Sequence, residues 1–151
     1  MTVPEFTVQH FLVCQSVAWE GPAGPRTLRT LEGVGYRFAV PPAAEPDFEF
    51  EVLWVYCRLI RRNHVAGKTQ FRIVAVWHDG PTHPRRVRAY QLLPVRMTSH
   101  QDVVEIAWPL RPAVFPGLGR FEPRLQRHSS ESIGRQWRTM ARDFLFIERR
   151  P

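Results

Sequence analysis

The stretch from 111 to 125, RPAVFPGLGRFEPRL, most constrains the fold, because its breakers exclude a helix. Pro112 and Pro116 lack the amide hydrogen that a helix interior needs. Gly117 and Gly119 take positive φ angles at little cost, which suits a turn. Pro116 and Gly117 together suit the central pair of a type II turn, where proline presets the first φ and glycine accepts the second. The sequence therefore predicts a corner here.

A half-buried strand is expected directly after this corner. Apolar and charged side chains alternate from Arg120 to Leu125, with Phe121 and Leu125 on the apolar face. Pro123 lies within this run and has no N–H for a neighbouring strand. We therefore expect the strand to lie at a sheet edge or to carry a bulge.

Short apolar or alternating runs, separated by glycine, proline and polar turn residues, occupy the rest of the chain. Strands are expected at His10–Val17, Thr27–Val40, Phe48–Leu59, Gln70–His78, Arg85–Leu93, Val103–Leu110 and Asp143–Glu148. The glycines of Thr27–Val40 predict a bend or bulge within it, and Pro41–Pro46 is expected to be an exposed connector. Phe48–Leu59 and Gln70–His78 are expected to pair as an antiparallel hairpin.

The segment 133–141 is open to two interpretations, a short helix or an irregular strand, and the strand is slightly favoured. The chain then holds about eight strands and no strong amphipathic helix. This pattern predicts an all-β fold, an antiparallel two-sheet sandwich of the immunoglobulin-like or C2-like kind. A β-barrel is the alternative.

The arrangement of FLVCQSV, TLRTLEGVGYRFAVP, FEVLWVYCRL, FRIVAVWHDG and FPGLGRFEPRL resembles a family of small uncharacterised bacterial β-sandwich proteins, a domain of unknown function. The resemblance covers most of the chain and implies the sandwich fold. It supplies no catalytic residues. The sequence departs from the simple pattern at Pro123 and in the long segment from Gln126 to Arg142.

The length of 151 residues predicts a single β-sandwich domain spanning 1–151, large enough to bury a core of its own. No apolar run reaches the length of a membrane-spanning helix, and no positively charged start precedes the first apolar run. We expect a cytoplasmic protein without a membrane partner. Cys14 and Cys57 lie in apolar runs and are expected to be buried thiols, with a cross-sheet disulfide as the alternative.

The net charge of +7 is carried by arginine, since Lys68 is the only lysine among 21 basic residues. A GC-rich coding sequence would produce this bias together with the 14 prolines, so the charge alone does not identify a partner. A phosphate-binding surface needs its charges gathered on one face. The densest clusters are Arg85, Arg86 and Arg88, and the interaction candidates Arg135, Trp137, Arg138 and Arg142.

Several groups of residues could take part in catalysis or metal binding, but each also fits a structural role. His78, Asp79 and His83 are close enough in sequence to bind zinc, yet Asp79 followed by glycine is already a good turn former. Glu49 and Glu51 share a strand face but fit a solvated surface. Serines 129, 130 and 132 lack a nucleophile-elbow pattern, and no phosphate-binding glycine loop is present. We expect no catalytic residue, cofactor or metal.

Two functions remain from the sequence. The first is a non-enzymatic protein-interaction or assembly module, an accessory subunit of a larger bacterial system, because sandwiches recruit partners through edges and faces. The alternative is a nucleic-acid-binding module in which Trp137 stacks on a base while Arg135, Arg138 and Arg142 contact phosphates.

Overall fold

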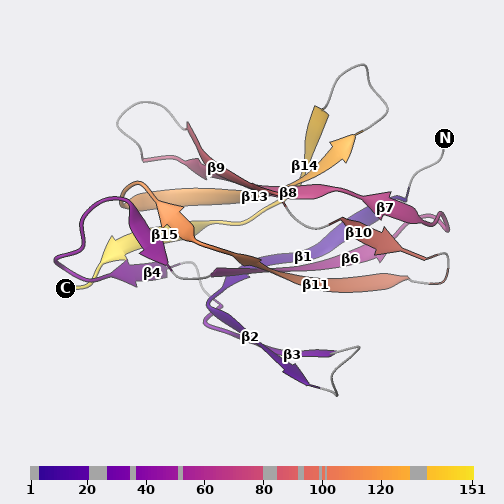
Figure 1. Ribbon diagram of the computed structural model, residues 1–151, viewed down its shortest axis with the longest axis horizontal. Helices are drawn as coiled ribbons and strands as arrows, with labels where there is room; N and C mark the ends of the chain where they lie inside the picture. The colour runs from indigo at the N-terminus through magenta and orange to yellow at the C-terminus, as the bar shows by residue number, and fades with distance from the viewer. Residues whose placement is uncertain are drawn as a thin grey trace.

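The computed structural model is an all-β sandwich and describes residues 4–20, 27–34, 37–50, 53–79, 85–91, 94–98, 100, 102–129 and 136–151. Two sheets pack face to face, as the sequence predicted (Figure 1). The three-stranded sheet has the order β1 (Phe6–Cys14), β6 (Leu53–Arg61), β11 (Val103–Leu110). The six-stranded sheet has the order β4 (Arg37–Val40), β15 (Leu145–Arg149), β13 (Gly119–Ser129), β8 (Phe71–Trp77), β9 (Arg85–Gln91), and β14 (Gln136–Arg142) also pairs with β13.

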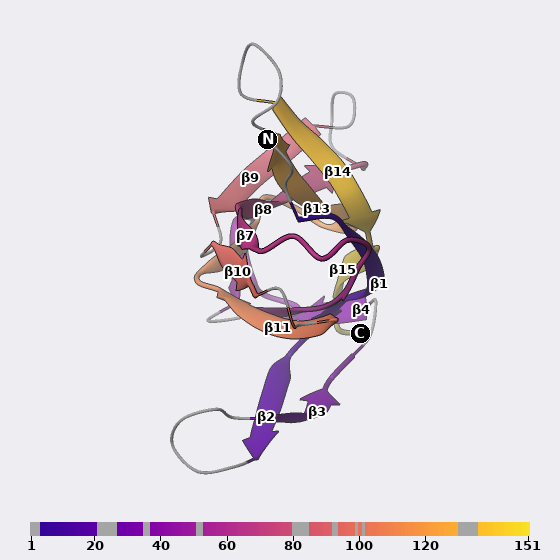
Figure 2. The ribbon, with the colours of Figure 1, turned by 90° about the vertical axis from the view of Figure 1, so that its right-hand side faces the viewer.

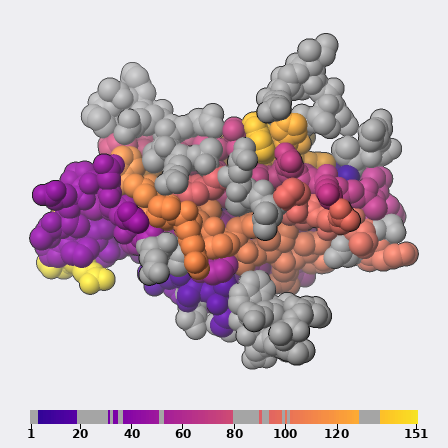
Figure 3. All heavy atoms as spheres, viewed as in Figure 1, coloured from indigo at the N-terminus to yellow at the C-terminus, as the bar shows by residue number. Residues whose placement is uncertain are grey.

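Three two-stranded ladders complete the fold. They are β2 (Ser16–Glu20) with β3 (Thr27–Glu32), β5 (Phe48–Phe50) with β12 (Ala113–Phe115), and β7 (Gly67–Thr69) with β10 (Val95–Met97). The hairpin of β2 and β3 extends away from the sandwich in two perpendicular views (Figures 1 and 2). Residues 37–50, in purple, form one end of the molecule beside the orange segment that contains β12 (Figure 3).

The core lies between the inner faces of the two sheets. Alternation along β8 sends Phe71 and Ile73 inward, and alternation along β13 does the same for Phe121 and Leu125. All four side chains are at most 1% exposed. Phe115 meets the ring of Phe121 edge to face, with 4.9 Å between centroids. The period-2 pattern therefore predicted the inward position of these four residues, although Val74 and Val76, on the other phase of β8, are buried as well.

The number of strands and their pairing differ from the prediction. The described residues form fifteen strands rather than about eight, because bends and turns divide the longer runs. Gly33, at φ +66°, ends β3, so the expected strand Thr27–Val40 contributes β3 and β4 to different sheets. β4 also runs parallel to β15, whereas all the pairs were expected to be antiparallel.

The predicted hairpin between Phe48–Leu59 and Gln70–His78 is wrong. β6 pairs with β1 and β11, whereas β8 pairs with β9 and β13 in the opposite sheet. The connection carries β7, which pairs with β10, so the chain crosses from one sheet to the other instead of turning back. Each strand is apolar enough to be central in its own sheet, and alternation says nothing about which neighbour it takes.

The corner at 111–125 exists, but its glycines do not play the expected roles. The positive φ belongs to Gly119, at +113°, and not to Gly117, so the predicted type II turn is wrong. Gly117 is required for space, since a Cβ there would lie 2.5 Å from Cζ2 of Trp77. The Trp77 indole packs against this bare backbone and donates a hydrogen bond to the Leu118 carbonyl at 3.0 Å.

Pro123 lies in a central strand, so the expected edge position is wrong. β8 pairs with one side of β13, and on the other side the partner changes from β15, at Phe121, to β14, at Arg124. Pro123 falls between these two partners, where the ladder is already interrupted. Its carbonyl accepts a hydrogen bond from the Asp143 N–H at 3.0 Å. A missing N–H is tolerated here because no residue of β14 or β15 pairs with Pro123 on that side.

The segment 136–142 is a strand, as favoured, and positions 133–135 lie outside the described residues.

Pro41–Pro46 contains no strand, as expected of a connector. Within the described ranges no helix is long and apolar enough to span a membrane.

Candidate interaction surface

One outer face of the sandwich gathers arginines and aromatic rings. Residues directly opposite one another in paired strands share a face, so the register defines it. On the central part of the six-stranded sheet this outer face carries Arg72, Arg124, Gln126, His128, Trp137, Thr139 and Arg142, which together we call the arginine face. In the sheet, β14 lies next to β13, and β9 lies next to β8 (Figure 2).

Trp137 is the centre of one cluster on the arginine face. The Arg72 guanidinium lies over its ring, 4.4 Å from the centroid, and His128 meets the ring at a centroid distance of 5.1 Å. Arg72 also donates from Nε to Gln126 at 2.8 Å, and Gln126 donates to Thr139 Oγ1 at 3.2 Å. These contacts fix the guanidinium in place and leave Trp137 half-buried.

A bulge in β14 decides which predicted candidates share this face. Gln126 lies opposite Thr139 and Leu125 opposite Ala141, so Met140 has no partner of its own. The extra residue turns Arg142 to the same face as Trp137, opposite Arg124. Without the bulge, strict alternation would have grouped Arg142 with Arg138.

The predicted interaction candidates therefore do not form one cluster. Trp137 and Arg142 share the arginine face, whereas Arg138 lies on the opposite face of β14, across from Arg127. Arg135 lies outside the described residues. Arg72 and Arg124 were not singled out from the sequence, although each is a charged residue on the outward phase of an alternating strand. That phase was the signal that could have identified them.

A buried carboxylate lies at one edge of the arginine face. The Glu122 side chain is 5% exposed, and its Oε1 accepts a hydrogen bond from Arg124 Nε. His78 Nε2 lies 3.5 Å from Glu122 Oε2. A carboxylate removed from water needs such a cation, so Glu122 and Arg124 hold each other in place.

The basic and aromatic character continues toward β4. Arg120 lies over the ring of Phe144, 5.8 Å from its centroid, and Phe144 is 43% exposed. Arg37 lies 6.0 Å from the centroid of Phe146 and forms a 3.0 Å ion pair with Glu148. The described side chains of this outer face thus include two carboxylates, Glu122 and Glu148, and both are already paired. They include five arginines, which are Arg37, Arg72, Arg120, Arg124 and Arg142.

The proposed zinc ligands are not assembled in the part of the chain that the structure covers. Asp79 Oδ2 accepts the Arg120 N–H at 2.6 Å, and His78 lies beside Glu122. His83 lies outside the described residues, and those that are described contain no group of three potential metal ligands. The observed role of Asp79 is to tie the end of β8 to β13.

The other residues considered for chemistry have structural surroundings. Cys14 and Cys57 are free and buried, as predicted, and burial raises the pKa of these thiols to about 11 and about 12. Such thiols are poor nucleophiles near neutral pH. Glu49 is exposed on β5 and Ser129 ends β13, whereas Glu51, Ser130 and Ser132 lie outside the described residues.

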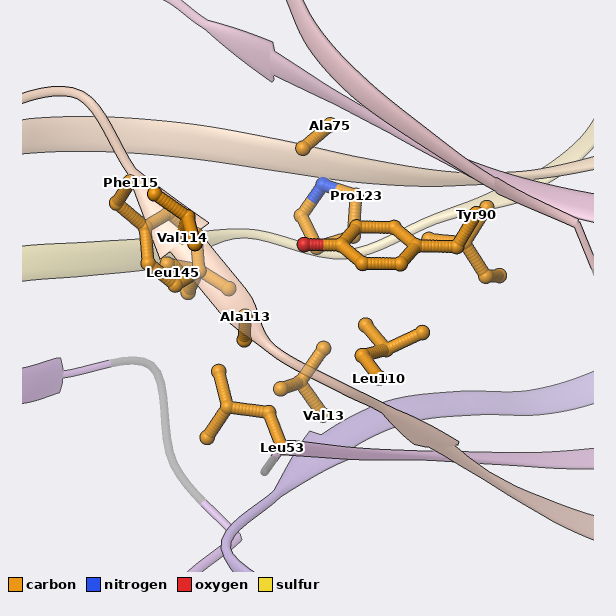
Figure 4. A pocket seen from close by; sticks show the side chains of 11 residues that line it. Val13, Leu53, Ala75, Tyr90, Leu110, Ala113, Val114, Phe115, Pro123 and Leu145 are labelled. Atoms are coloured by element: carbon orange, nitrogen blue, oxygen red, sulfur yellow. The ribbon is translucent and has the colours of Figure 1, made fainter. Parts of the chain in front are cut away.

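An apolar pocket of about 20 Å³ lies between the sheets (Figure 4). Side chains from both sheets line it, including Val13, Leu53, Ile73 and Leu145. The hydroxyl of Tyr90 donates a hydrogen bond to the Pro112 carbonyl at 3.2 Å. A space of this size holds about one water molecule and presents apolar groups, so it is a packing defect of the core and not a substrate site.

The arginine face is therefore the described region with the clearest binding character. Trp137 and Gln126 hold Arg72 in place, and the buried Glu122 holds Arg124, which suits these arginines to recognise anionic groups. The family resemblance stays a prediction. No protein-family model matches the sequence, and no curated protein matches it either.

Proposed function

We propose that this chain is a non-enzymatic protein-interaction module, an accessory subunit that contacts its partner through the arginine face. The observation that carries the proposal is the concentration of arginines and aromatic rings there, with both carboxylates already paired. Arginine and tryptophan are the residues that most often contribute strongly to protein interfaces. Arginines already held in place also lose little conformational freedom on binding.

The tryptophans support this proposal by where they lie. Trp77 and Trp108 are buried in the core, where burial alone accounts for them. Trp137 instead lies half-buried on the arginine face. A large ring placed half in water adds contact area for a partner at little entropic cost.

The proposal is tested by photo-crosslinking in the cells that naturally make this protein. A photoreactive amino acid replaces Thr139 on the arginine face or, as a matched control, Ala107 on the outer face of the three-stranded sheet. We expect position 139 to crosslink one defined protein and position 107 to give none. Equal crosslinking at both positions, or none at 139, would overturn the proposal.

The alternative function is nucleic-acid binding, and Trp137 beside Arg72 and Arg142 is the observation that favours it. Phosphate contacts make affinity fall steeply with salt, roughly as a power equal to the number of phosphates neutralised. A titration of a labelled oligonucleotide from low to high salt measures that slope. Binding with a steep slope would support this function, and no binding at low salt would remove it.

A further inference from the structure

The arginine face places two like charges directly opposite each other. Arg124 on β13 pairs in register with Arg142 on β14, and such pairs have Cβ atoms about 4.5–5.5 Å apart. Like charges in this position repel each other. Arg142 is exposed and has no bonded partner among the described residues. A bound anion between the two guanidinium groups would relieve the repulsion.

Arg124 is positioned for that contact by the buried carboxylate below it. Its Nε donates to Glu122, whose side chain is 5% exposed. An arginine has five N–H donors in a planar fork, and Glu122 engages the one at Nε. The rest of the guanidinium can still donate to a carboxylate while the Glu122 contact keeps the side chain in place.

Arg72 supplies a second cation one row further along the sheet. It lies opposite Gln126, two residues along β13 from Arg124, and Trp137 and Gln126 fix its guanidinium. Positions two residues apart on a strand are separated by about 6.6–6.8 Å. Side chains on one side of an extended peptide have the same spacing. The Arg72 guanidinium extends toward Trp137, which is opposite His128, so the cations lie one to two of these spacings apart. Acidic residues at alternate positions match such spacings.

We propose that the arginine face binds an extended acidic segment of a protein partner, in which one carboxylate bridges Arg124 and Arg142 and the next reaches Arg72. This inference rests on the proposed function and names the chemistry of the partner. Guanidinium forks recognise carboxylates by paired hydrogen bonds, and the net positive charge of the face selects an acidic partner.

The contacts of Trp137 favour a peptide over a single-stranded nucleic acid. Base stacking uses open aromatic faces that successive bases can cover. The Trp137 ring instead carries the Arg72 guanidinium on one face and His128 at 5.1 Å. The arginine face therefore offers mainly arginine N–H donors, which bind carboxylate oxygens well.

The proposal is tested by fluorescence anisotropy with three labelled probes of equal length. The first is a 12-residue peptide that alternates Glu and Ser, and the second carries the same glutamates in one block. The third is an oligothymidylate of 12 nucleotides. At low salt we expect the alternating peptide to bind at least about threefold more tightly than the block peptide, because only alternation matches both rows.

Two charge reversals on one strand provide the matched comparison. Arg142→Glu changes the arginine face, whereas Arg138→Glu makes the same charge change on the opposite face of β14. We expect Arg142→Glu to weaken binding of the alternating peptide by about tenfold or more and Arg138→Glu by less than about threefold. Both substitutions replace a like-charge pair with an opposite-charge pair, so both variants should fold. Arg142→Gln is the substitute should Arg142→Glu not fold.

Each outcome decides the proposal. If Arg142→Glu and Arg138→Glu weaken peptide binding equally, the peptide is attracted only by the overall charge of the protein. That result would overturn the proposal. Tighter binding of the oligothymidylate, lost in Arg142→Glu, would replace the acidic peptide with a nucleic acid. A partner that crosslinks at position 139 while no acidic peptide binds would overturn this inference and leave the interaction module standing.

Discussion

The two sheets bury similar residues on their inner faces and carry opposite chemistry on their outer faces. On the three-stranded sheet, Arg58 lies opposite Glu105, and Leu12, Ile60 and Val103 lie on the same outer face. That face is nearly neutral. Among the side chains that the structure describes, the outer face of the six-stranded sheet instead carries five arginines against two paired glutamates. A sandwich needs apolar inner faces only, so each outer face is free to serve a different purpose.

The polar contacts of the two outer faces also differ in how many charged groups they involve. The three-stranded sheet pairs neutral with charged groups, since the Tyr56 hydroxyl donates to Glu105 Oε2 at 3.0 Å. The six-stranded sheet pairs full charges, one of them buried, at Glu122 and Arg124. The arginine face is therefore stabilised by the pairing of opposite charges, as at Glu122 and Arg124. The other face is stabilised by burial and by a tyrosine hydroxyl that must keep its proton.

The largest difference is expected for removal of one glutamate from each face. Glu122→Ala leaves Arg124 without its partner on a buried site and should destabilise the fold by about 3 kcal/mol. This value is at the lower end of the cost expected for breaking a buried ion pair. We choose the lower end because the Arg124 side chain is 28% exposed, so water can partly solvate its charge. Glu105→Ala removes an exposed acceptor and should cost about 1 kcal/mol. Urea unfolding of both variants measures the two costs, and equal values would contradict the comparison.

An alkaline shift should weaken the three-stranded sheet selectively. Burial, and then the hydrogen bond to Glu105, raise the pKa of Tyr56 to about 12 from the usual 10. A raised pKa means that the folded state favours the neutral phenol. Its stabilising effect is therefore complete below pH 10 and is lost as the pH rises toward 12.

This loss amounts to about 2 kcal/mol by pH 11.5, since each pKa unit corresponds to about 1.4 kcal/mol. Urea midpoints of the natural sequence and of Tyr56→Phe, compared from pH 8 to 11.5, isolate it from other titrating groups. The stability difference between the two proteins should shrink with pH. A difference that stays constant would show that Tyr56 does not titrate as argued.

The smallest effect is expected from removing one arginine of each face. Arg72→Met loses the contact with Trp137 and the bond to Gln126, and it should cost about 1–2 kcal/mol. Arg58→Met, the control, should change stability by no more than about 0.5 kcal/mol, because Arg58 Nε is buried without a hydrogen bond. Thermal melts resolve this difference. An equal loss in both would mean that the ring contact contributes nothing to stability.

Alternation in the sequence predicted the class of fold and most of the core, because a residue's phase on a strand decides whether it is buried. It correctly placed Arg120, Glu122 and Arg124 together on one charged face. It failed where the outcome depended on distant segments. The choice of partner for β6 and β8 is set by packing across the whole sandwich.

The candidate site was predicted only in part for a related reason. Of the four candidates, Trp137 and Arg142 share one face, whereas Arg138 lies on the other face. The bulge at Met140 places Arg142 on the face of Trp137 and not on that of Arg138. It leaves no mark in the sequence, since methionine suits either geometry. Arg72 joins Trp137 from a strand more than sixty residues earlier, and only the folded pairing brings them together.

Pro123 has an influence beyond its own position. A slip of β14 by one residue along β13 would turn Arg142 away from Arg124 and invert every side chain of that strand. The pairing of β14 with β13 cannot extend past Arg124, because the next residue, Pro123, has no N–H to donate. The Pro123 carbonyl already accepts a hydrogen bond from the Asp143 N–H. A proline without any reactive group thus limits how far the β14 ladder can extend, and this keeps Arg142 on the same outer face as Arg124.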